Sequence, residues 1–364
     1  MHRRLPKFIA FIIKSPQTGE PPMSIFYRTI LASLGAIAMV SIMKPSHAGE
    51  LTIYAGAEAD NIKYFSEVFA KAHPNIKLNW IRDSTGIIAA RVLAEKDNPK
   101  ADVLFAMAVT SMTGFAKMGM FEPYSPKGIE KLNPLFLDGK TPAEWVGHYG
   151  WASAMCFNTI EAGKGKMPRP ASWADLTNPV YKGKITMPNP ASSGTGYLMV
   201  AAWIQMLGEA KAWEFMDKLH ENVGVYSHSG SKPCEQAASG EYVIGLSFPF
   251  RAIRLKEQGA PIDIILAQEG TGWEMQTGAI MKGTKNLADA KTFMDWSLTE
   301  EAMKAYGSRY EVTAAPVELQ RSKFFPADLE KKLIKNDFAW AASEQGRILA
   351  EWRKRYDTKS EPRK

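Results

Sequence analysis

Short strand-like runs alternate with helix-like stretches along the chain after residue 50. Residues 51–55 (LTIYA) and 76–82 (IKLNWIR) alternate as strands do, and residues 58–73 between them carry apolar side chains at helical spacing. A further helix opens at residues 85–86, and residues 101–105 (ADVLF) form a short apolar strand. This order predicts an α/β fold with a parallel sheet and crossover helices. In such sheets, ligands bind at the carboxyl ends of the strands, beside the helix N-termini.

The same alternation restarts in the second half of the chain. Strand-like runs at residues 184–187, 223–227, 242–248 and 262–266 alternate with helical stretches that end near residues 207, 239 and 258. Two extended segments, residues 150–158 and 272–281, lie between the units and are expected to pass from one to the other. We therefore predict two α/β lobes joined by two hinge crossovers, with the site in the cleft. Lobe 1 is assigned residues 49–152 and 278–318, and lobe 2 residues 153–277. Residues 319–364 are expected to add C-terminal helices that pack on the lobes and a frayed tail.

The first 48 residues differ from the rest. Arg28 precedes an apolar run at residues 30–43, and a small-residue site of the A-x-A type ends at Ala48. This pattern is typical of a cleaved secretory signal peptide, for which Met23 is an alternative start. The run is shorter than the roughly 20 residues that span a bilayer, although an uncleaved anchor is the alternative. The predicted location is the periplasm.

The basic character of the chain comes mainly from this segment. It carries six basic residues and one acidic residue, so the formal net charge falls from +7 for the whole chain to +2 for residues 49–364. No basic stripe with interleaved aromatic residues remains, which argues against a nucleic-acid partner.

The chain contains two cysteines, Cys156 and Cys234. An oxidising compartment would allow them to form one disulfide. The alternative is two buried, reduced thiols in core positions, because sequence spacing does not give the distance between them.

The strongest local signal for a site is the segment NPASSGTGY at residues 189–197, between a strand and a helix. Ser192, Ser193 and Thr195 supply hydroxyl donors, and Gly194 lets backbone N–H groups turn toward an oxyanion at the helix N-terminus. An ordinary helix cap would use the same residue types.

Two similar helix starts strengthen the interpretation as an anion site. Ser84, Thr85 and Gly86 open a helix in the first lobe, and Ser229 and Ser231 open one in the second. Each alone is explained by capping. Three such starts at strand ends in two facing lobes predict an anion cradle.

Acidic and aromatic residues near the predicted cleft are further candidates. Glu58 follows the first strand and Glu274 lies in the second crossover. A buried carboxylate there needs a partner, which a ligand ammonium would supply. Phe248 is a candidate for an apolar wall, with core packing as the alternative. Arg251 is a weaker anion candidate, because such an arginine commonly pairs with nearby acids.

The search for catalytic and metal motifs is negative. The sequence has no HExxH, no phosphate loop of the Walker type, no G-x-S-x-G elbow and no Cys/His cluster with metal spacing. We therefore expect a binding protein rather than an enzyme, with no metal and no cofactor.

Together, the motifs YAGAEAD, RDSTG, NPASSGTGY, SHSGSKPCEQAASGEY and GLSF resemble the periplasmic substrate-binding proteins of ABC importers. The nearest subgroup is the one associated with 2-aminoethylphosphonate, within the ferric-iron-binding protein family, and the resemblance covers residues 50–316. It implies the type II periplasmic binding-protein fold, the membrane subunits of an ABC importer as partners, and a monomer. It also implies that the serine-rich loops hold the phosphonate and that Glu58, with Glu274 or Asp83, pairs with the ammonium.

Iron is the sharpest alternative ligand. Iron binders of this family usually have an adjacent tyrosine pair where this chain has Phe248-Pro249-Phe250, and phenyl rings cannot bind a metal. Tyr310 is a single late tyrosine that does not replace the pair. A polyamine or another small organic solute is the second alternative.

Overall fold

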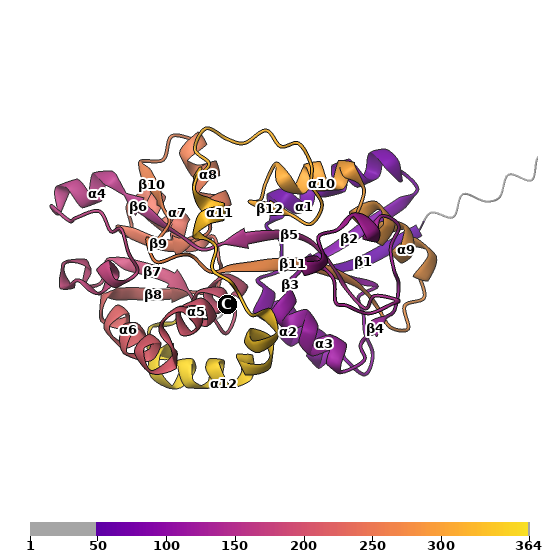
Figure 1. Cartoon of the computed structure of the whole chain (residues 1–364), viewed down its shortest axis with the longest axis horizontal. Coiled ribbons are helices and arrows are strands. Elements are labelled where there is room, and N and C mark those ends of the chain that lie inside the picture. Colours follow the sequence, from indigo (N-terminus) through magenta and orange to yellow (C-terminus); the bar gives the residue numbers. More distant parts are fainter. Residues whose placement is uncertain (1–48, 363–364) are drawn as a thin grey trace, which may run out of the picture. The chain divides into compact units, whose positions relative to one another are not determined.

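Two β-sheets organise the part of the chain that the structure describes, residues 49–362 of a computed structural model (Figure 1). The predicted signal peptide, residues 1–48, lies outside the described residues. Within residues 49–362, no helix is both long enough and apolar enough to cross a membrane.

The first sheet has the strand order β12-β5-β11-β3-β1-β2, and β4 pairs with β11 beside this path. Its strands are β1 (Gly49–Ala55), β2 (Ile76–Arg82), β3 (Val103–Ala108), β4 (Phe121–Glu122), β5 (Val146–Ala152), β11 (Trp273–Met281) and β12 (Val312–Thr313). The helices of this part are α1 (Ala59–Ala72), α2 (Thr85–Ala94), α3 (Val109–Lys117), α9 (Leu287–Ser297) and α10 (Glu300–Gly307). We call these elements the first-sheet side.

The second sheet has the order β10-β6-β9-β7-β8. Its strands are β6 (Ala154–Asn158), β7 (Ile185–Pro188), β8 (Val223–Ser227), β9 (Ile244–Ser247) and β10 (Ile262–Ile265). The helices α4 (Thr159–Lys164), α5 (Gly194–Leu207), α6 (Glu209–Asn222), α7 (Lys232–Ser239) and α8 (Pro249–Glu257) complete the second-sheet side. Short 3-10 turns lie at Ile129–Lys131, Pro134–Phe136, Ala174–Thr177, Pro179–Tyr181 and Asp357–Lys359.

The parallel pairing expected from the sequence occurs at one end of each sheet. β1 pairs in parallel with β2 and β3, and β7 with β8 and β9. The strands that carry the chain between the sheets pair antiparallel instead: β11 with β3 and β5, and β6 with β9 and β10. Both sheets are therefore mixed, with parallel and antiparallel pairs.

The two passages between the sheets lie side by side. Only Ser153 separates β5 from β6, and its backbone N–H donates to the carbonyl oxygen of Gly272 at 2.9 Å. The hydroxyls of Ser153 and Thr271 are 2.7 Å apart. The sequence assigned residues 273–277 to the second lobe, whereas they form the start of β11 in the first sheet. The side-chain pattern of residues 272–281 would fit a strand of either sheet, so the sequence alone does not show at which residue the chain returns to the first sheet.

A disulfide joins Cys156 of β6 to Cys234 of α7, with a Cα–Cα distance of 5.3 Å. The sequence left this pairing open. Both residues are fully buried beside Ala237, Ala252 and Ile262, so the bridge ties α7 to the second sheet within an apolar cluster.

The C-terminal region crosses the molecule and ends in an ordered segment. It contains α11 (Leu329–Lys332) and α12 (Phe338–Tyr356), which packs against α3 of the first-sheet side and α5 of the second-sheet side. The tail was predicted to be frayed, but Ser360 forms a β-bridge to Tyr226 and Glu361 donates its N–H to the carbonyl oxygen of Tyr226 at 2.9 Å. The basic residues of this segment gave no sign of these backbone contacts.

Candidate ligand-binding site

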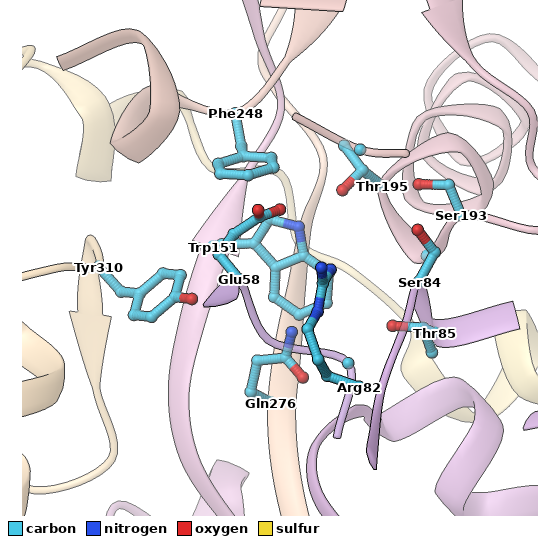
Figure 2. A pocket seen from close by; sticks show the side chains of 13 residues that line it. Glu58, Arg82, Ser84, Thr85, Trp151, Ser193, Thr195, Phe248, Gln276 and Tyr310 are labelled. Carbon is cyan, nitrogen blue, oxygen red and sulfur yellow. The ribbon is translucent and has the colours of Figure 1, made fainter. Parts of the chain in front are cut away.

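A small cavity lies where α2 from the first-sheet side meets α5 from the second-sheet side (Figure 2). The space open to the centre of a water molecule is about 40 Å³, enough for a few waters. Its lining is Gly56, Glu58, Arg82, Ser84, Thr85, Trp151, Ser193, Gly194, Thr195, Gly230, Phe248, Gln276 and Tyr310. Both sheets therefore contribute to one site.

The helix starts at this cavity leave their hydroxyl groups unused. Ser84 is the N-cap of α2 and Ser193 the N-cap of α5, and neither side chain makes a cap hydrogen bond. Thr299 and Asp337, in contrast, cap α10 and α12 by accepting from backbone N–H groups. Both N-cap residues have extended backbone and line the cavity, so each of these helices begins at its wall. This geometry favours the anion-site interpretation over simple capping.

The two sides touch at these helix starts. The N–H of Gly86 donates to the carbonyl oxygen of Ser192 at 3.0 Å. A Cβ at Gly86 would lie 2.7 Å from the carbonyl oxygen of Ala191, and a Cβ at Gly194 would lie 3.0 Å from Oγ1 of Thr85. The structure is therefore in a closed arrangement that only glycine permits at Gly86.

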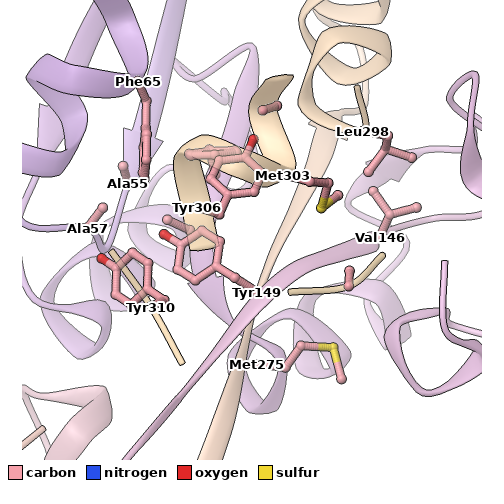
Figure 3. Packing of buried hydrophobic residues seen from close by; sticks show 14 of the residues in the cluster. Ala55, Ala57, Phe65, Val146, Tyr149, Met275, Leu298, Met303, Tyr306 and Tyr310 are labelled. Atoms are coloured by element: carbon pink, nitrogen blue, oxygen red, sulfur yellow. The ribbon is translucent and has the colours of Figure 1, made fainter. Parts of the chain in front are cut away.

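The opposite end of the cavity is aromatic and amide-lined. Figure 2 shows the side chains of Trp151, Phe248 and Tyr310 around this end, with Gln276 below them. Tyr310 stacks on Tyr149 with ring centroids 4.1 Å apart, within the first-sheet core (Figure 3). Oε1 of Gln276 is buried and has no partner among the described residues. This oxygen therefore lacks the hydrogen bond that buried polar atoms usually have.

Glu58 lines the cavity, and its carboxylate already pairs with an arginine. Nη2 of Arg251 on α8 lies 3.0 Å from Oε2 of Glu58, across the two sides. The same guanidinium lies 3.8 Å from Asp60 and 3.6 Å from Glu235. Arg251 thus pairs with acids, as expected from the sequence, and its contact with Glu58 uses Oε2 rather than Oε1.

Known proteins resemble the chain along most of its length. A family model described as "Bacterial extracellular solute-binding protein" matches residues 98–343. The chain belongs to this family. A protein of Haemophilus influenzae is 35% identical over 314 residues, which are 83% of this chain and 89% of that protein. A probable ABC transporter periplasmic-binding protein of Sinorhizobium fredii is 29% identical over 311 residues, 84% of each chain.

Solved structures agree with this placement. The periplasmic binding protein AfuA from Actinobacillus pleuropneumoniae, solved with exogenous fructose-6-phosphate bound, has a TM-score of 0.78 and 32% identity. The match covers 85% of this chain and 99% of AfuA. The expected type II periplasmic binding-protein fold is confirmed, and this solute-binding protein has the two mixed sheets described above.

Seven of the residues predicted for the site line the cavity of the solute-binding protein, and five do not. Glu58, Ser84, Thr85, Ser193, Gly194, Thr195 and Phe248 belong to the lining. Gly86 and Ser192 lie behind it and join the two sides through their backbone. Ser229 contacts the start of α7 instead: its Oγ accepts from the N–H groups of Ser231 and Lys232, and its hydroxyl lies 3.1 Å from that of Ser231, the N-cap residue. Between these serines, Gly230 reaches the cavity instead.

Glu274 lies away from the cavity. It is buried in β11, where its carboxylate accepts from Oγ1 of Thr110 at 2.9 Å and from the N–H of Met275 at 2.8 Å. Burial raises the pKa of Glu274 to about 7, against the opposing effect of these hydrogen bonds. The predicted pairing of Glu274 with a ligand ammonium therefore has no contact to support it.

Four side chains of the lining were missed by sequence reasoning. Arg82 ends β2 directly before the predicted loop, so the strand-end rule already pointed to it. Trp151 and Gln276 lie on the two segments predicted to cross between the lobes. Tyr310 was considered only as a metal ligand.

Residues 357–361, near the C-terminus, support the loop at residues 189–197, which we call the serine loop. Oγ of Ser192 lies 2.8 Å from Nδ1 of His228, and Nε2 of His228 lies 2.9 Å from the carbonyl oxygen of Glu361. The N–H of His228 donates to Oε1 of Glu361 at 2.7 Å, and Lys232 pairs with the same carboxylate. Asn189, at the start of the loop, donates to Oγ of Ser360 at 2.8 Å. The conformation of the loop thus depends on residues at the end of the chain.

Among residues 49–362, no three His, Cys, Asp or Glu side chains gather into a group that could hold a metal ion. At the position of the missing tyrosine pair, the ring of Phe248 faces the cavity (Figure 2).

Proposed function

We propose that this solute-binding protein captures a small organic phosphonate, foremost 2-aminoethylphosphonate, and delivers it to an ABC importer by hinged closure. The observation that carries the proposal is the meeting of two helix N-termini, from opposite sides, whose N-cap hydroxyls of Ser84 and Ser193 are not used for capping. Delivery to an ABC importer is supported by the 29% identical relative from Sinorhizobium fredii, which is named for that system.

The phosphonate group would bind at the helix starts. There the hydroxyls of Ser84, Thr85, Ser193 and Thr195 line the cavity, and the N-termini of α2 and α5 add partial positive charge. Arg82 contributes a full charge and forms no ion pair with any residue in the described range. Hydrogen bonds to a charged group contribute about 1.5–3 kcal/mol each, so a few of them exceed the cost of association and give micromolar affinity.

The amino group would bind at the aromatic end. The rings of Trp151 and Phe248 would attract an ammonium through cation–π interactions, each about 0.5–2 kcal/mol. The free Oε1 atoms of Glu58 and Gln276 would accept its hydrogens. Arg251 already neutralises part of the charge on Glu58. The aromatic side chains would therefore contribute more to binding of the amino group than we expected from the sequence. The small cavity also favours a ligand of few heavy atoms.

A phosphate monoester is the second candidate. AfuA, which is 32% identical, was solved with fructose-6-phosphate. The same anion cradle would take the phosphoryl group, while Trp151 and Gln276 would contact the sugar. Such a ligand needs more room than the closed cavity provides, so the two sides would have to stay further apart.

Calorimetric titration of the purified protein separates these candidates. The ligands are 2-aminoethylphosphonate, methylphosphonate, fructose-6-phosphate, ferric citrate and putrescine. We expect the tightest binding for 2-aminoethylphosphonate. Tighter binding of fructose-6-phosphate would show that phosphate monoesters are the preferred ligands. Binding of ferric citrate or putrescine alone would contradict the proposed anion site.

Two variants test the roles of the two ends. Thr195→Val should weaken every phosphoryl ligand, whereas Thr113→Val, whose hydroxyl bonds only within α3, should not. Glu58→Gln should weaken 2-aminoethylphosphonate more than methylphosphonate. Equal losses of affinity for both ligands would mean that Glu58 does not contact the amino group.

A further inference from the structure

A second, larger cavity lies on the other side of Tyr310. Its volume is about 450 Å³, and Tyr310 is the residue that lines both cavities. The second cavity is bounded by α8, by Tyr64 of α1, by residues 307–311 at the end of α10 and after it, and by residues 320–325 of the segment that leads to α11. It therefore adjoins the ligand site but lies between different elements.

Two guanidinium groups line this cavity from opposite sides of the protein. Arg254 belongs to α8 on the second-sheet side, and Arg309 follows α10 on the first-sheet side. Within the described part of the chain, neither forms an ion pair or a side-chain hydrogen bond. Burial, together with the positive charge of Arg254, lowers the pKa of Arg309. The two charges are thus close enough to repel each other.

Aromatic rings hold the basic groups in place. The guanidinium of Arg309 lies over the ring of Tyr64, 4.6 Å from its centroid. Arg321 lies over Phe325 at 4.3 Å and donates to the carbonyl oxygens of Tyr310 and Glu311 at 2.9 Å and 2.7 Å. Stacking of this kind orients a planar cation without neutralising it.

The acids near this cavity do not cancel its positive charge. Glu257 lines it, and Asp60 is near enough to raise the pKa of Arg309, but neither forms an ion pair with Arg254 or Arg309. Glu311 is 2% exposed, and burial raises its pKa to about 8. Its Oε1 accepts from the N–H of Phe250 at 3.1 Å, while its Oε2 has no partner among the described residues. A neutral Glu311 would be able to donate a hydrogen bond from Oε2.

We propose that this cavity is a second anion site, which binds a small dianionic oxyanion between Arg254 and Arg309. The two arginines come from opposite sides, so the bound anion replaces their mutual repulsion with two attractive contacts that join the sides. The anion therefore stabilises the closed arrangement from behind the ligand cavity. This site goes beyond the proposed phosphonate function, and its chemistry is independent of the serine loops.

Sulfate is a suitable probe, measured by thermal unfolding against sodium chloride of equal ionic strength. We expect a saturable rise in the unfolding temperature of roughly 4 °C at saturating sulfate. The double variant R254Q/R309Q should lose this rise. It should also unfold at a slightly higher temperature than the parent at low salt, because a repulsive pair is gone. The control R353Q/K354Q removes the same charge from exposed positions of α12 and should keep the sulfate effect.

Sulfate could also occupy the serine loops, so a third variant separates the two sites. In S193A/T195V the sulfate-dependent rise should persist, whatever happens to phosphonate binding. A rise lost in S193A/T195V would assign the sulfate effect to the ligand cavity and overturn the second site. Absence of any rise in the parent protein, or an equal rise in R254Q/R309Q, would do the same. If the double variant fails to fold, R254Q alone should still lose most of the rise.

Discussion

Replacing Gly86 by alanine should block closure without damaging either side. The added Cβ would lie 2.7 Å from the carbonyl oxygen of Ala191 and 2.8 Å from the carbonyl carbon and oxygen of Ser192. These are backbone atoms of the facing loop, so no flexible side chain can move aside. The hydrogen bond from Gly86 to Ser192, at 3.0 Å, would be lost as the two sides separate.

The magnitude follows from these two effects. A net hydrogen bond contributes about 0.5–1.5 kcal/mol, and a steric overlap of this size costs about 1–3 kcal/mol. The closed form would lose roughly 2–4 kcal/mol, which raises the Kd about 30- to 1000-fold if ligand binds tightly only when the sides close. The free protein should become slightly more stable, because alanine is about 1 kcal/mol better than glycine within a helix.

The assay is calorimetric titration of Gly86→Ala with 2-aminoethylphosphonate, or with whichever phosphoryl ligand binds the parent, together with thermal unfolding of the free protein. Gly114→Ala is the matched control, since Gly114 lies in α3 and a Cβ there meets nothing within 4 Å. An unchanged Kd for Gly86→Ala would refute the closure argument. A lower unfolding temperature for the free variant would show that the contact belongs to the basic fold.

Three further predictions concern stability and the support of the serine loop. Glu274 is protonated in the folded state up to about pH 7, so stability should fall by on the order of 3 kcal/mol from pH 4.5 to 7, and Glu274→Gln should flatten this slope in denaturant titrations. Replacing Cys156 and Cys234 by alanine opens a loop closed over a separation of 78 residues, and should cost about 4 kcal/mol in the free energy of unfolding. Glu361→Gln should weaken phosphoryl-ligand binding about tenfold, because His228 loses its charged partner. An unaltered Kd for that variant would mean that the loop holds its shape without the tail.

Local patterns sufficed to predict most elements. The alternation at residues 76–82 and 223–227 gave the bounds of β2 and β8 as the structure has them. The helices α3 and α6 escaped notice: α3 follows β3 without an intervening turn signal, and only one residue separates α6 from α5. Antiparallel pairing of β11 was also beyond reach, since it depends on a strand that joins the sheet from about 120 residues away.

The sequence predicted those residues of the candidate site whose place depends only on the local order of strands and helices. Ser84, Ser193 and Thr195 lie at strand ends before helices, which the sequence reveals. Partners across the cleft were hidden, because nothing local indicates that Arg251 of α8 will meet Glu58 193 residues away. Likewise, Glu274 is a charged residue of the kind that contacts ligands. Successive side chains of a strand point to opposite faces of the sheet, however, and that of Glu274 contacts Thr110.

The support of the serine loop by residues 357–361 sets an order on biosynthesis. Ser192 and Asn189 emerge from the ribosome long before His228 can bond to Glu361 and before Ser360 can accept from Asn189. A chain in which residues 357–361 have not yet been made therefore cannot hold the loop through these contacts. Removal of residues 357–361 would therefore leave Asn189 and His228 without these contacts, far along the chain from the residues removed.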